Sequence, residues 1–207
     1  MNQELLIYGV HGLCWGAFGL ARWWCARGAA PADRARPADS ARSAAVPVAK
    51  EQQTGPGSRT VLGLHMVAFF LLYFGMGDAV FGHRVPEVFQ GQRAVGTVLM
   101  LLGSAAMTWA LLSFRSWRFR AQVEKGHELA TGGPFKWVRH PIYLGLNLLM
   151  LGTSVWIPTP PVIAGFVLGA ICGDLRGRAE EKLLLQVFGA TYRDYMGRTH
   201  RFLPGIY

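Results

Sequence analysis

Cysteines are scarce in this sequence of 207 residues, which has only three of them. Cys14, Cys25 and Cys172 lie in or beside apolar runs and show no C-x-x-C spacing. The pattern therefore indicates neither a disulfide framework nor a zinc site, and we expect no metal ligands. Small buried side chains are the default interpretation of all three.

Acidic residues are also few, at 12 against 21 lysines and arginines, which gives a net charge of +9. Such an excess is compatible with nucleic-acid binding, so the distribution of the charges has to decide. All the basic residues except Arg84 and Arg93 lie in three polar segments, at 22–59, 115–139 and 176–201. This clustering indicates membrane topology, and we expect no nucleic-acid partner.

Long apolar runs with very few charged residues alternate with these basic segments. About 20 apolar residues cross the hydrocarbon core of a bilayer as a helix, and residues 5–24, 61–82 and 95–114 approach that length. Two shorter apolar runs follow at 142–157 and 161–171, and the proline cluster between them predicts a tight helical hairpin. A soluble domain of this size would need five helices that are apolar on nearly every face, which disfavours that alternative.

The sequence thus predicts an all-α polytopic integral membrane protein with about five transmembrane helices, the last two forming a short hairpin. A cytoplasmic cofactor-binding segment and a C-terminal helix complete the prediction. The first run is alternatively a secretory signal, but it lacks a basic region before the apolar stretch, where Glu4 is the only charge. With five spans the basic segments share one face, which the positive-inside rule makes cytoplasmic, and the N-terminus lies outside.

The predicted organisation has four parts. Residues 1–25 form the first transmembrane helix, 26–59 a flexible basic cytoplasmic linker, 60–114 two further helices, and 115–207 the core that carries chemistry. The linker is rich in Ala, Pro, Arg and Ser and has no apolar periodicity. A short amphipathic helix on anionic lipid headgroups is the alternative interpretation of this segment.

The stretch of residues 127–145, HELATGGPFKWVRHPIYLG, holds the densest set of polar and glycine residues. Gly132, Gly133 and Pro134 predict a turn whose backbone groups are free to approach a ligand. Arg139 and His140 stand directly before Pro141, which suits the first turn of a membrane helix. Arg139 is alternatively a headgroup or topology anchor, whereas a histidine at this place can hydrogen-bond a polar ligand.

These residues follow a pattern that continues after the hairpin. The first part reads H-x-L-x-T-x-G-x-aromatic and then R-H-P-x-Y-x-G, and it comprises His127, Leu129, Thr131, Gly133, Phe135, Arg139, His140, Pro141, Tyr143 and Gly145. The second part reads R-x-x-x-E-E, F-G-x-x-Y-x-x-Y and a late proline, and it comprises Arg176, Glu180, Glu181, Phe188, Gly189, Tyr192, Tyr195 and Pro204.

In this order and spacing, the pattern resembles that of the isoprenylcysteine carboxyl methyltransferases and their prokaryotic relatives. The resemblance covers residues 115–207, and it implies S-adenosylmethionine as cofactor. It also implies that the cofactor pocket is lined by Gln122, His127, Glu128, Leu129, Ala130, Phe135, His140, Pro141, Ile142 and Tyr143. Phe135 stands where the family often has tyrosine, so a phenol hydrogen bond is missing while stacking on adenine remains.

The resemblance further implies that Arg176 and Glu181 face the methyl acceptor, with Glu181 orienting Arg176. Helical spacing instead pairs Arg176 with Glu180 and Arg178 with Glu181. Either the helix is irregular there, or Glu180 holds Arg176 while Glu181 reaches the pocket. A solvated helix with surface ion pairs is the alternative for the whole cluster.

Other conspicuous residues receive structural interpretations. Phe188, Tyr192 and Tyr195 recur at helical spacing and indicate a helix packed on the membrane surface. His65 and Asp78 lie inside the second apolar run and are interpreted as structural, since Asp78 falls near the end remote from the motif.

The predicted function is methyl transfer from S-adenosylmethionine to a membrane-borne, lipid-like acceptor, as carboxyl methylation of a prenylcysteine-like or similar amphiphile, in a bacterial inner membrane. Sterol reductases carry a similar R-H-P-x-Y-x-G element, so an NADPH-dependent membrane reductase is the alternative enzyme. A non-catalytic membrane scaffold is the third possibility. No residue pattern identifies the acceptor or the oligomeric state.

Overall fold

The structure is a computed structural model that describes residues 5–28, 57–113 and 129–207. These ranges hold six α-helices and one 3-10 helix, with no strand among the described residues. The predicted linker therefore lies almost wholly outside the described residues. Its first residues continue the first helix, which ends at Gly28, and its last ones begin the second, at Gly57.

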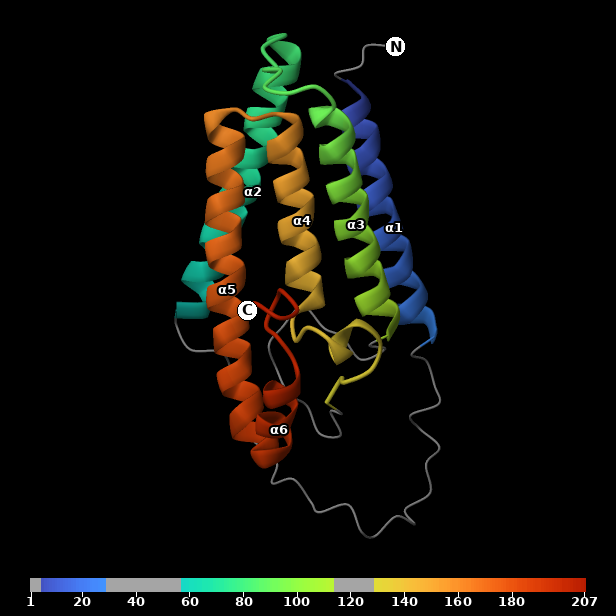
Figure 1. Ribbon diagram of the computed structural model, residues 1–207, viewed down its shortest axis with the longest axis vertical. Coiled ribbons are helices and arrows are strands. Elements are labelled where there is room, and N and C mark those ends of the chain that lie inside the picture. Colours follow the sequence, from blue (N-terminus) through green and yellow to red (C-terminus); the bar gives the residue numbers. More distant parts are fainter. Residues whose placement is uncertain (1–4, 29–56, 114–128) are drawn as a thin grey trace.

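Helix α1 spans Leu6–Gly28, α2 spans Gly57–Phe81 and α3 spans Gln92–Ser113. Helices α4, Pro141–Trp156, and α5, Pro160–Phe188, form the hairpin, and the short α6 spans Ala190–Arg198. Figure 1 shows α1 to α5 side by side, with α6 beyond the end of the bundle beside the lower half of α5. The helix order of the sequence prediction is therefore confirmed.

The surface of the bundle is apolar. Arg59–Phe81 and Gln92–Ser113 are each long and apolar enough to cross a membrane, and Pro141–Trp156 is a shorter apolar helix. Leu13, Phe70 and Leu102 point outward from three different helices, each more than half exposed. A water-soluble monomer rarely leaves so much apolar surface uncovered. The chain is an all-α polytopic integral membrane protein, as predicted.

Helix α5 differs from the expected short arm of the hairpin. It begins at Pro160, one residue before the predicted run of 161–171, and continues without interruption for 29 residues to Phe188. Only its first half is apolar, and the second half, which carries the cluster DLRGRAEEK, extends past the ends of α3 and α4 (Figure 1). The helix does not stop at the membrane surface because no proline follows Pro161 before Phe188, and the chain instead bends at Gly189, with a φ of 54°.

Close packing fixes the hairpin against its neighbours. Helices α3 and α4 approach so closely that a side chain at Gly145 would meet the carbonyl oxygen of Gly103 at 2.5 Å. Small residues permit such contact between membrane helices, where packing replaces the hydrophobic effect as the main attraction. Gly145, the last residue of the R-H-P-x-Y-x-G element, is thus explained by helix packing.

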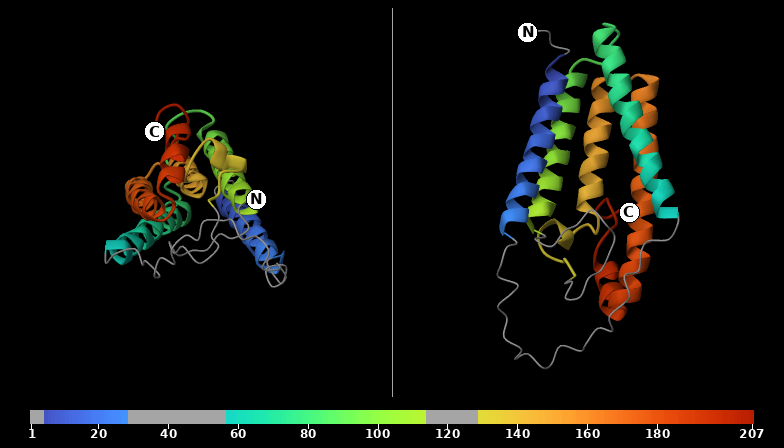
Figure 2. Two further views of the ribbon diagram at one scale, coloured as in Figure 1. Left: turned by 90° about the horizontal axis from the view of Figure 1, so that it is seen from below. Right: turned by 180° about the vertical axis from the view of Figure 1, so that it is seen from behind.

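The arrangement around the hairpin is open on one side. Helix α3 packs on α4 and α1 packs on α3, while α2 packs on α5. Viewed along the helices, α1 and α2 therefore form the two arms of a V (Figure 2). Side chains join the arms, since Trp15 Nε1 of α1 donates to the Tyr73 hydroxyl of α2 at 2.5 Å.

The polar segments gather at one end of this bundle, which we call the polar end. Helix α1 ends there, α2 begins there, α3 ends there, and the segment before α4, the second half of α5 and α6 all lie there (Figure 1). At the opposite end, Asp78 accepts from Arg84 in an exposed ion pair of 2.7 Å. The prediction that the basic segments share one face is consistent with this arrangement.

Candidate active site

The polar end begins with the predicted glycine turn. Gly133–Lys136 forms a single 3-10 turn, with Gly133 at a φ of 57°. A side chain at Gly133 would collide with Ser113 at the end of α3, so the turn is pressed against that helix. Before it, the backbone N–H groups of residues 129–132 donate no hydrogen bond to any other described residue. The predicted turn is therefore present, while its approach to a ligand stays a prediction.

A short backbone bridge ties this segment to the C-terminus. Val138 pairs with His200 in a parallel bridge, and the Arg139 N–H donates to the His200 carbonyl at 2.7 Å. The His140 N–H donates to the Arg201 carbonyl at 3.2 Å. Two segments that lie far apart in the sequence, on either side of the hairpin, therefore form one unit at the polar end.

Glu181 lies at the centre of a buried ion cluster. Arg139 Nε donates to Glu181 Oε1 at 2.8 Å, and Arg201 donates through Nε at 3.1 Å and through Nη2 to Oε2 at 2.7 Å. The side chain of Glu181 is 5% exposed and that of Arg139 is 10% exposed. We call these three residues the clasp, because they join the segment before α4, the middle of α5 and the C-terminal segment.

The clasp depends on full compensation of its charges. Burial by itself would raise the pKa of Glu181, but hydrogen bonds and charges from His140, Arg201 and Arg139 outweigh it and hold the pKa well below the ordinary value. Arg139 also donates to the carbonyls of Met196 and Thr199. Removal of one partner from such a group leaves an unpaired buried charge, at a cost of about 3–5 kcal/mol.

Two expectations about charged residues are wrong. Arg139 is not a headgroup anchor, since its guanidinium points into the clasp. Arg178 does not pair with Glu181, because it donates to Asp174, one helical turn earlier, at 2.6 Å. The interpretation of the cluster as surface ion pairs holds for Arg178, whose side chain is exposed, but not for Glu181.

His140 lies between the two glutamates. Its Nδ1 is 3.5 Å from Glu180 Oε2. Its Nε2 is 3.4 Å from Glu181 Oε1, which is close enough for an ion pair but is not aligned for a hydrogen bond. The ring packs on Gly177, where an added side chain would come within 3.3 Å. Burial lowers the pKa of His140, but Glu180 and Glu181 together raise it above the ordinary value. The two carboxylates therefore favour the protonated form of the buried imidazole.

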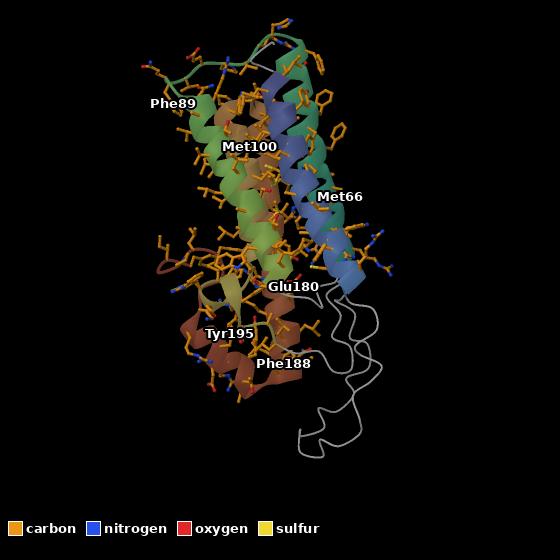
Figure 3. All side chains as sticks on the ribbon, turned by 90° about the vertical axis from the view of Figure 1, so that its right-hand side faces the viewer. Met66, Phe89, Met100, Glu180, Phe188 and Tyr195 are labelled. Carbon is orange, nitrogen blue, oxygen red and sulfur yellow. The ribbon has the colours of Figure 1, made fainter. Side chains whose placement is uncertain are left out.

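Arg176, Tyr143 and Glu180 form a second group, on the side of the clasp that faces the apolar bundle. The Tyr143 hydroxyl donates to Glu180 Oε1 at 2.5 Å, and the Arg176 guanidinium lies 5.6 Å from the centre of the Tyr143 ring. No ion pair joins Arg176 to Glu180 among the residues the structure describes. Figure 3 places Glu180 at the level where α3 ends, with Phe188 and Tyr195 farther from the bundle.

Helix α5 is regular through Arg176, Glu180 and Glu181. An irregular helix therefore does not explain how these three side chains are oriented. Glu180 turns toward Tyr143 and His140, and Glu181 turns toward Arg139 and Arg201. Arg176 is half-buried and is not oriented by Glu181, contrary to the role first inferred for that glutamate.

The predicted cofactor residues differ in their placement. Gln122, His127 and Glu128 lie outside the described residues. Leu129, Ala130, Phe135 and Tyr143 are half-exposed, as residues at a binding site would be, whereas His140, Pro141 and Ile142 are buried in the first turn of α4 or just before it. Ile142 belongs to the apolar core, so its side chain does not line an open pocket.

One residue of the clasp, Arg201, was not singled out by any motif in the sequence. It lies between the motif residues Tyr195 and Pro204, and the backbone bridge at His200 brings it to Glu181. Tyr192 and Tyr195 are buried under the clasp, and the Tyr195 hydroxyl donates to the carbonyl of Phe135 at 2.7 Å. Their predicted helix exists as α6, and it packs on α5.

Comparison with known proteins places this site in context. Residues 92–191 match the family model described as phospholipid methyltransferase. Protein-S-isoprenylcysteine O-methyltransferase of Saccharomyces cerevisiae is 35% identical over 118 residues, which cover 54% of this chain and 48% of the relative. The enzyme of the same name from Xenopus laevis is 31% identical over 116 residues, which cover 54% of this chain and 40% of the relative.

The chain thus spans about half the length of the curated relatives that it matches. The fold is similar to a solved structure of the eukaryotic intramembrane Ras methyltransferase named isoprenylcysteine carboxyl methyltransferase. That likeness has a TM-score of 0.60 at 20% identity and covers 98% of this chain and 68% of the other. The resemblance seen in the motifs and the membrane fold are confirmed. The aligned relatives are methyltransferases, which implies a methyl donor.

Proposed function

We propose that this protein is an S-adenosylmethionine-dependent methyltransferase that methylates a carboxylate of a membrane-borne amphiphile. The observation that carries the proposal is the Arg176 guanidinium, half-buried beside Tyr143 where the apolar bundle meets the polar end. A cation at this depth is costly in a membrane protein unless it meets an anion, and no carboxylate of the described residues pairs with it. An acceptor carboxylate would complete the pair.

The residues present fit the methyl donor. The free backbone N–H groups of residues 129–132 and the half-exposed Phe135 ring offer hydrogen bonds and a stacking surface. The carboxylate of Glu180, one quarter exposed, supplies negative charge toward a cationic ligand. When bound, S-adenosylmethionine supplies an electrophilic methyl group on a sulfonium. Leu129, Ala130, Phe135 and Tyr143 are the described residues that would hold it.

The reaction needs no general base, since a carboxylate is already ionised at neutral pH. With the cofactor bound, an acceptor oxygen would take the methyl group as the carbon–sulfur bond breaks, and the electron pair of that bond would stay on sulfur. Opposite charges cancel in this step, so a site that excludes water favours the transition state over the charged reactants. Arg176 positions the acceptor, because a planar guanidinium holds a carboxylate by two parallel hydrogen bonds.

The clasp has a supporting role in this proposal. Glu181 is saturated by Arg139 and Arg201, so Glu180 is the glutamate that borders the reacting groups. The clasp fixes His140 and the first turn of α4, which carries Tyr143. Errors of about 1 Å in the placement of reacting groups can slow an enzyme by two orders of magnitude, so this rigidity matters for rate.

We further propose that the polar end faces the cytoplasm of a bacterial inner membrane and that the N-terminus lies outside. The support is the concentration of lysine and arginine in the segments that meet at the polar end. The acceptor enters from the bilayer and the cofactor from the cytoplasm. A prenylcysteine-like carboxylate is one such acceptor.

Two measurements test the function. Purified protein in lipid nanodiscs is titrated with S-adenosylhomocysteine and, separately, with NADPH; we expect saturable binding of the first and none of the second. Methyl transfer from labelled S-adenosylmethionine into a bacterial lipid extract should then yield a product whose label is released by mild base, as a methyl ester requires. Binding of NADPH would favour a reductase, and binding of neither ligand would favour a scaffold.

A further inference from the structure

Residues 201–207, which follow α6, turn back toward the bundle, and we call them the hook. Figure 1 shows the hook beside α5, with its end level with the lower end of α4. The backbone N–H groups of Phe202 and Leu203 both donate to the backbone oxygen of Tyr207 at 2.8 Å. Gly205, with a φ of 79°, permits this tight turn. The hook therefore has a fixed shape against α5.

Phe202 of the hook is buried against His140. The centres of the two rings are 5.9 Å apart, and both rings pack over Gly177 of α5. A side chain at Gly177 would come within 3.3 Å of the imidazole and 3.6 Å of the Phe202 ring, so glycine leaves room for both. The imidazole also stacks on Tyr143, with 5.7 Å between the centres. Phe202 is thus an apolar support for the ring that contacts Tyr143.

Tyr207 contacts Arg201 with both its hydroxyl and its ring. The hydroxyl accepts from Arg201 Nη1 and from Arg178 Nη2, the latter at 2.8 Å, and it donates to Asp174 Oδ1 at 3.0 Å. The Arg201 guanidinium lies 5.0 Å from the centre of the Tyr207 ring, which is a cation–π distance. All the hydrogen-bonding capacity of this hydroxyl is therefore used to hold the charged groups around it.

Arg201 joins two carboxylates of α5. Its Nη1 donates to Asp174 Oδ1 at 3.2 Å, while its Nε and Nη2 hold the two oxygens of Glu181. Asp174 and Glu181 are seven residues apart, which is about two helical turns, so they lie on one face of α5. The guanidinium is a planar fork of fixed shape. Contacts of Asp174 and Tyr207 with Nη1 therefore also set the direction from which Arg201 reaches Glu181.

The groups that the hook supports lie directly beside the proposed reacting groups. His140 is within 3.5 Å of both Glu180 and Glu181, and the Tyr143 hydroxyl donates to Glu180. If Arg201 released Glu181, that carboxylate would compete with Glu180 for the imidazole. A shift of His140 would then move the ring of Tyr143, which stacks on it.

We propose that Phe202 and Tyr207 are positioning residues for methyl transfer. Phe202 acts through His140, and Tyr207 acts through Arg201 of the clasp. Together they fix Tyr143 and its bond to Glu180. The inference rests on the proposed function. Because small errors in the placement of reacting groups slow an enzyme strongly, loss of either side chain affects the rate more than it affects cofactor affinity.

The first test removes the Phe202 ring in the full chain in nanodiscs. Titration with S-adenosylhomocysteine counts the binding sites, and labelled S-adenosylmethionine with a bacterial lipid extract gives the turnover per site. We expect Phe202→Leu, which keeps an apolar side chain, to lower turnover per site about tenfold, with affinity for S-adenosylhomocysteine within about threefold. Leu203→Ala is the matched control, because its side chain is exposed in the same hook, and it should change neither quantity.

A purely structural role gives a different result. A variant that only misfolds has fewer binding sites, but each remaining site turns over at the normal rate. Unchanged turnover per site in Phe202→Leu, or an equal loss in Leu203→Ala, would overturn the role of Phe202.

The second test separates the hydroxyl of Tyr207 from its ring. Tyr207→Phe keeps the ring beside Arg201 and loses the hydroxyl bonds, so we expect turnover per site to fall about threefold. Tyr207→Ala loses the ring as well and should lower it about tenfold. Ile206→Ala, at an exposed neighbouring position, is the control and should have no effect. Turnover in both Tyr207 variants equal to that of the control would contradict the role of Tyr207.

A double variant tests whether Phe202 acts through His140. Residues that act through a shared contact have effects that do not add. In the background of His140→Gln, we therefore expect Phe202→Leu to lower turnover per site less than about twofold further. A full additional tenfold loss would show that Phe202 does not act through the imidazole.

Failure of the inference is distinguishable from failure of the proposed function. If the unmodified protein binds S-adenosylhomocysteine and transfers the methyl group, and the hook variants turn over like their controls, only the positioning role is wrong. If the unmodified protein binds no S-adenosylhomocysteine, the proposed function and the inference both fail.

Discussion

Among the described residues, two buried polar clusters differ in charge and completeness. The first lies in the middle of the bundle and joins α1, α2 and α4; we call it the midplane cluster, comprising His11, Trp15, Tyr73 and Thr153. The second is the polar end, with the clasp and the groups around Arg176. The first is neutral and every polar atom in its chain of hydrogen bonds has a partner. The second is charged, and some of its polar groups have no hydrogen-bond partner among the described residues.

The donor and the acceptor of each hydrogen bond in the midplane cluster can be assigned from its neighbours. Thr153 donates its only hydroxyl proton to the Leu149 carbonyl at 2.8 Å, so it accepts from His11 Nε2 at 3.0 Å. The other ring nitrogen of His11 then accepts from the Tyr73 hydroxyl at 3.1 Å, and Tyr73 in turn accepts from Trp15. A closed network of this kind holds helices in register.

The contrast separates structural polar residues from functional ones. Because its hydrogen bonds are complete, the midplane cluster connects helices and has no free donor or acceptor for a ligand. At the polar end the clasp is complete in the same way, but Arg176 beside it has no carboxylate partner among the described residues. His11 and His65 are both buried, so burial by itself does not identify a site.

The largest effect should follow from opening the clasp. Glu181→Ala leaves Arg139 and Arg201 buried without a counter-charge, and we expect a loss of about 3–5 kcal/mol in the stability of the polar end. Thermal unfolding in detergent and the affinity for S-adenosylhomocysteine measure it. Asp78→Asn is the matched control, because it breaks the exposed ion pair with Arg84 and should cost under about 1 kcal/mol. Equal effects would show that the clasp is not a structural centre.

Opening the midplane cluster should cost less and leave the chemistry intact. Tyr73→Phe removes the hydroxyl that serves both His11 and Trp15, so we expect a destabilisation of about 1–3 kcal/mol. Methyl transfer per folded molecule should stay within twofold of the unmodified protein. A large loss of activity at unchanged stability would mean that the midplane cluster belongs to the acceptor path, and the contrast drawn above would fail.

The mildest effect concerns pH. The pKa of His140 is raised in the folded protein, so its stabilising contribution is complete below about pH 6.5 and is lost as the pH rises through the folded value. Glu181, whose pKa is lowered, loses its contribution only well below its ordinary value of 4.5 and does not act in this window. The melting temperature should fall as the pH rises above about 6.5, and His140→Gln should flatten that slope. An identical slope in the variant would contradict the assignment.

Much of this fold could be predicted because local signals agree with it. The prolines between residues 157 and 161 place the hairpin turn, and Pro141 after His140 places the start of α4. The C-terminal end of α5 could not be predicted in the same way. An apolar run predicts which residues lie in the membrane, but it does not predict where the helix ends beyond the membrane.

The site was predictable in part. Tyr143, His140, Arg176 and Glu180 do come together, as their motifs indicate. The choice between Glu180 and Glu181 could not be made from spacing, since it depends on Arg201, which reaches Glu181 through the bridge between Val138 and His200. Two irregular segments that pair over a long sequence distance show no periodic pattern of residues, so their pairing cannot be predicted from the sequence.

The most direct test of the account compares Arg176→Ala with Arg193→Ala, an exposed arginine on α6 outside the site. Methyl transfer and S-adenosylhomocysteine affinity are measured on both variants in nanodiscs. We expect Arg176→Ala to lower transfer at least about a hundredfold, with cofactor affinity within threefold, because a charge-assisted pair of hydrogen bonds to the acceptor is lost. Arg193→Ala should change neither quantity. Retained transfer in Arg176→Ala, or loss of cofactor binding in place of transfer, would contradict the account.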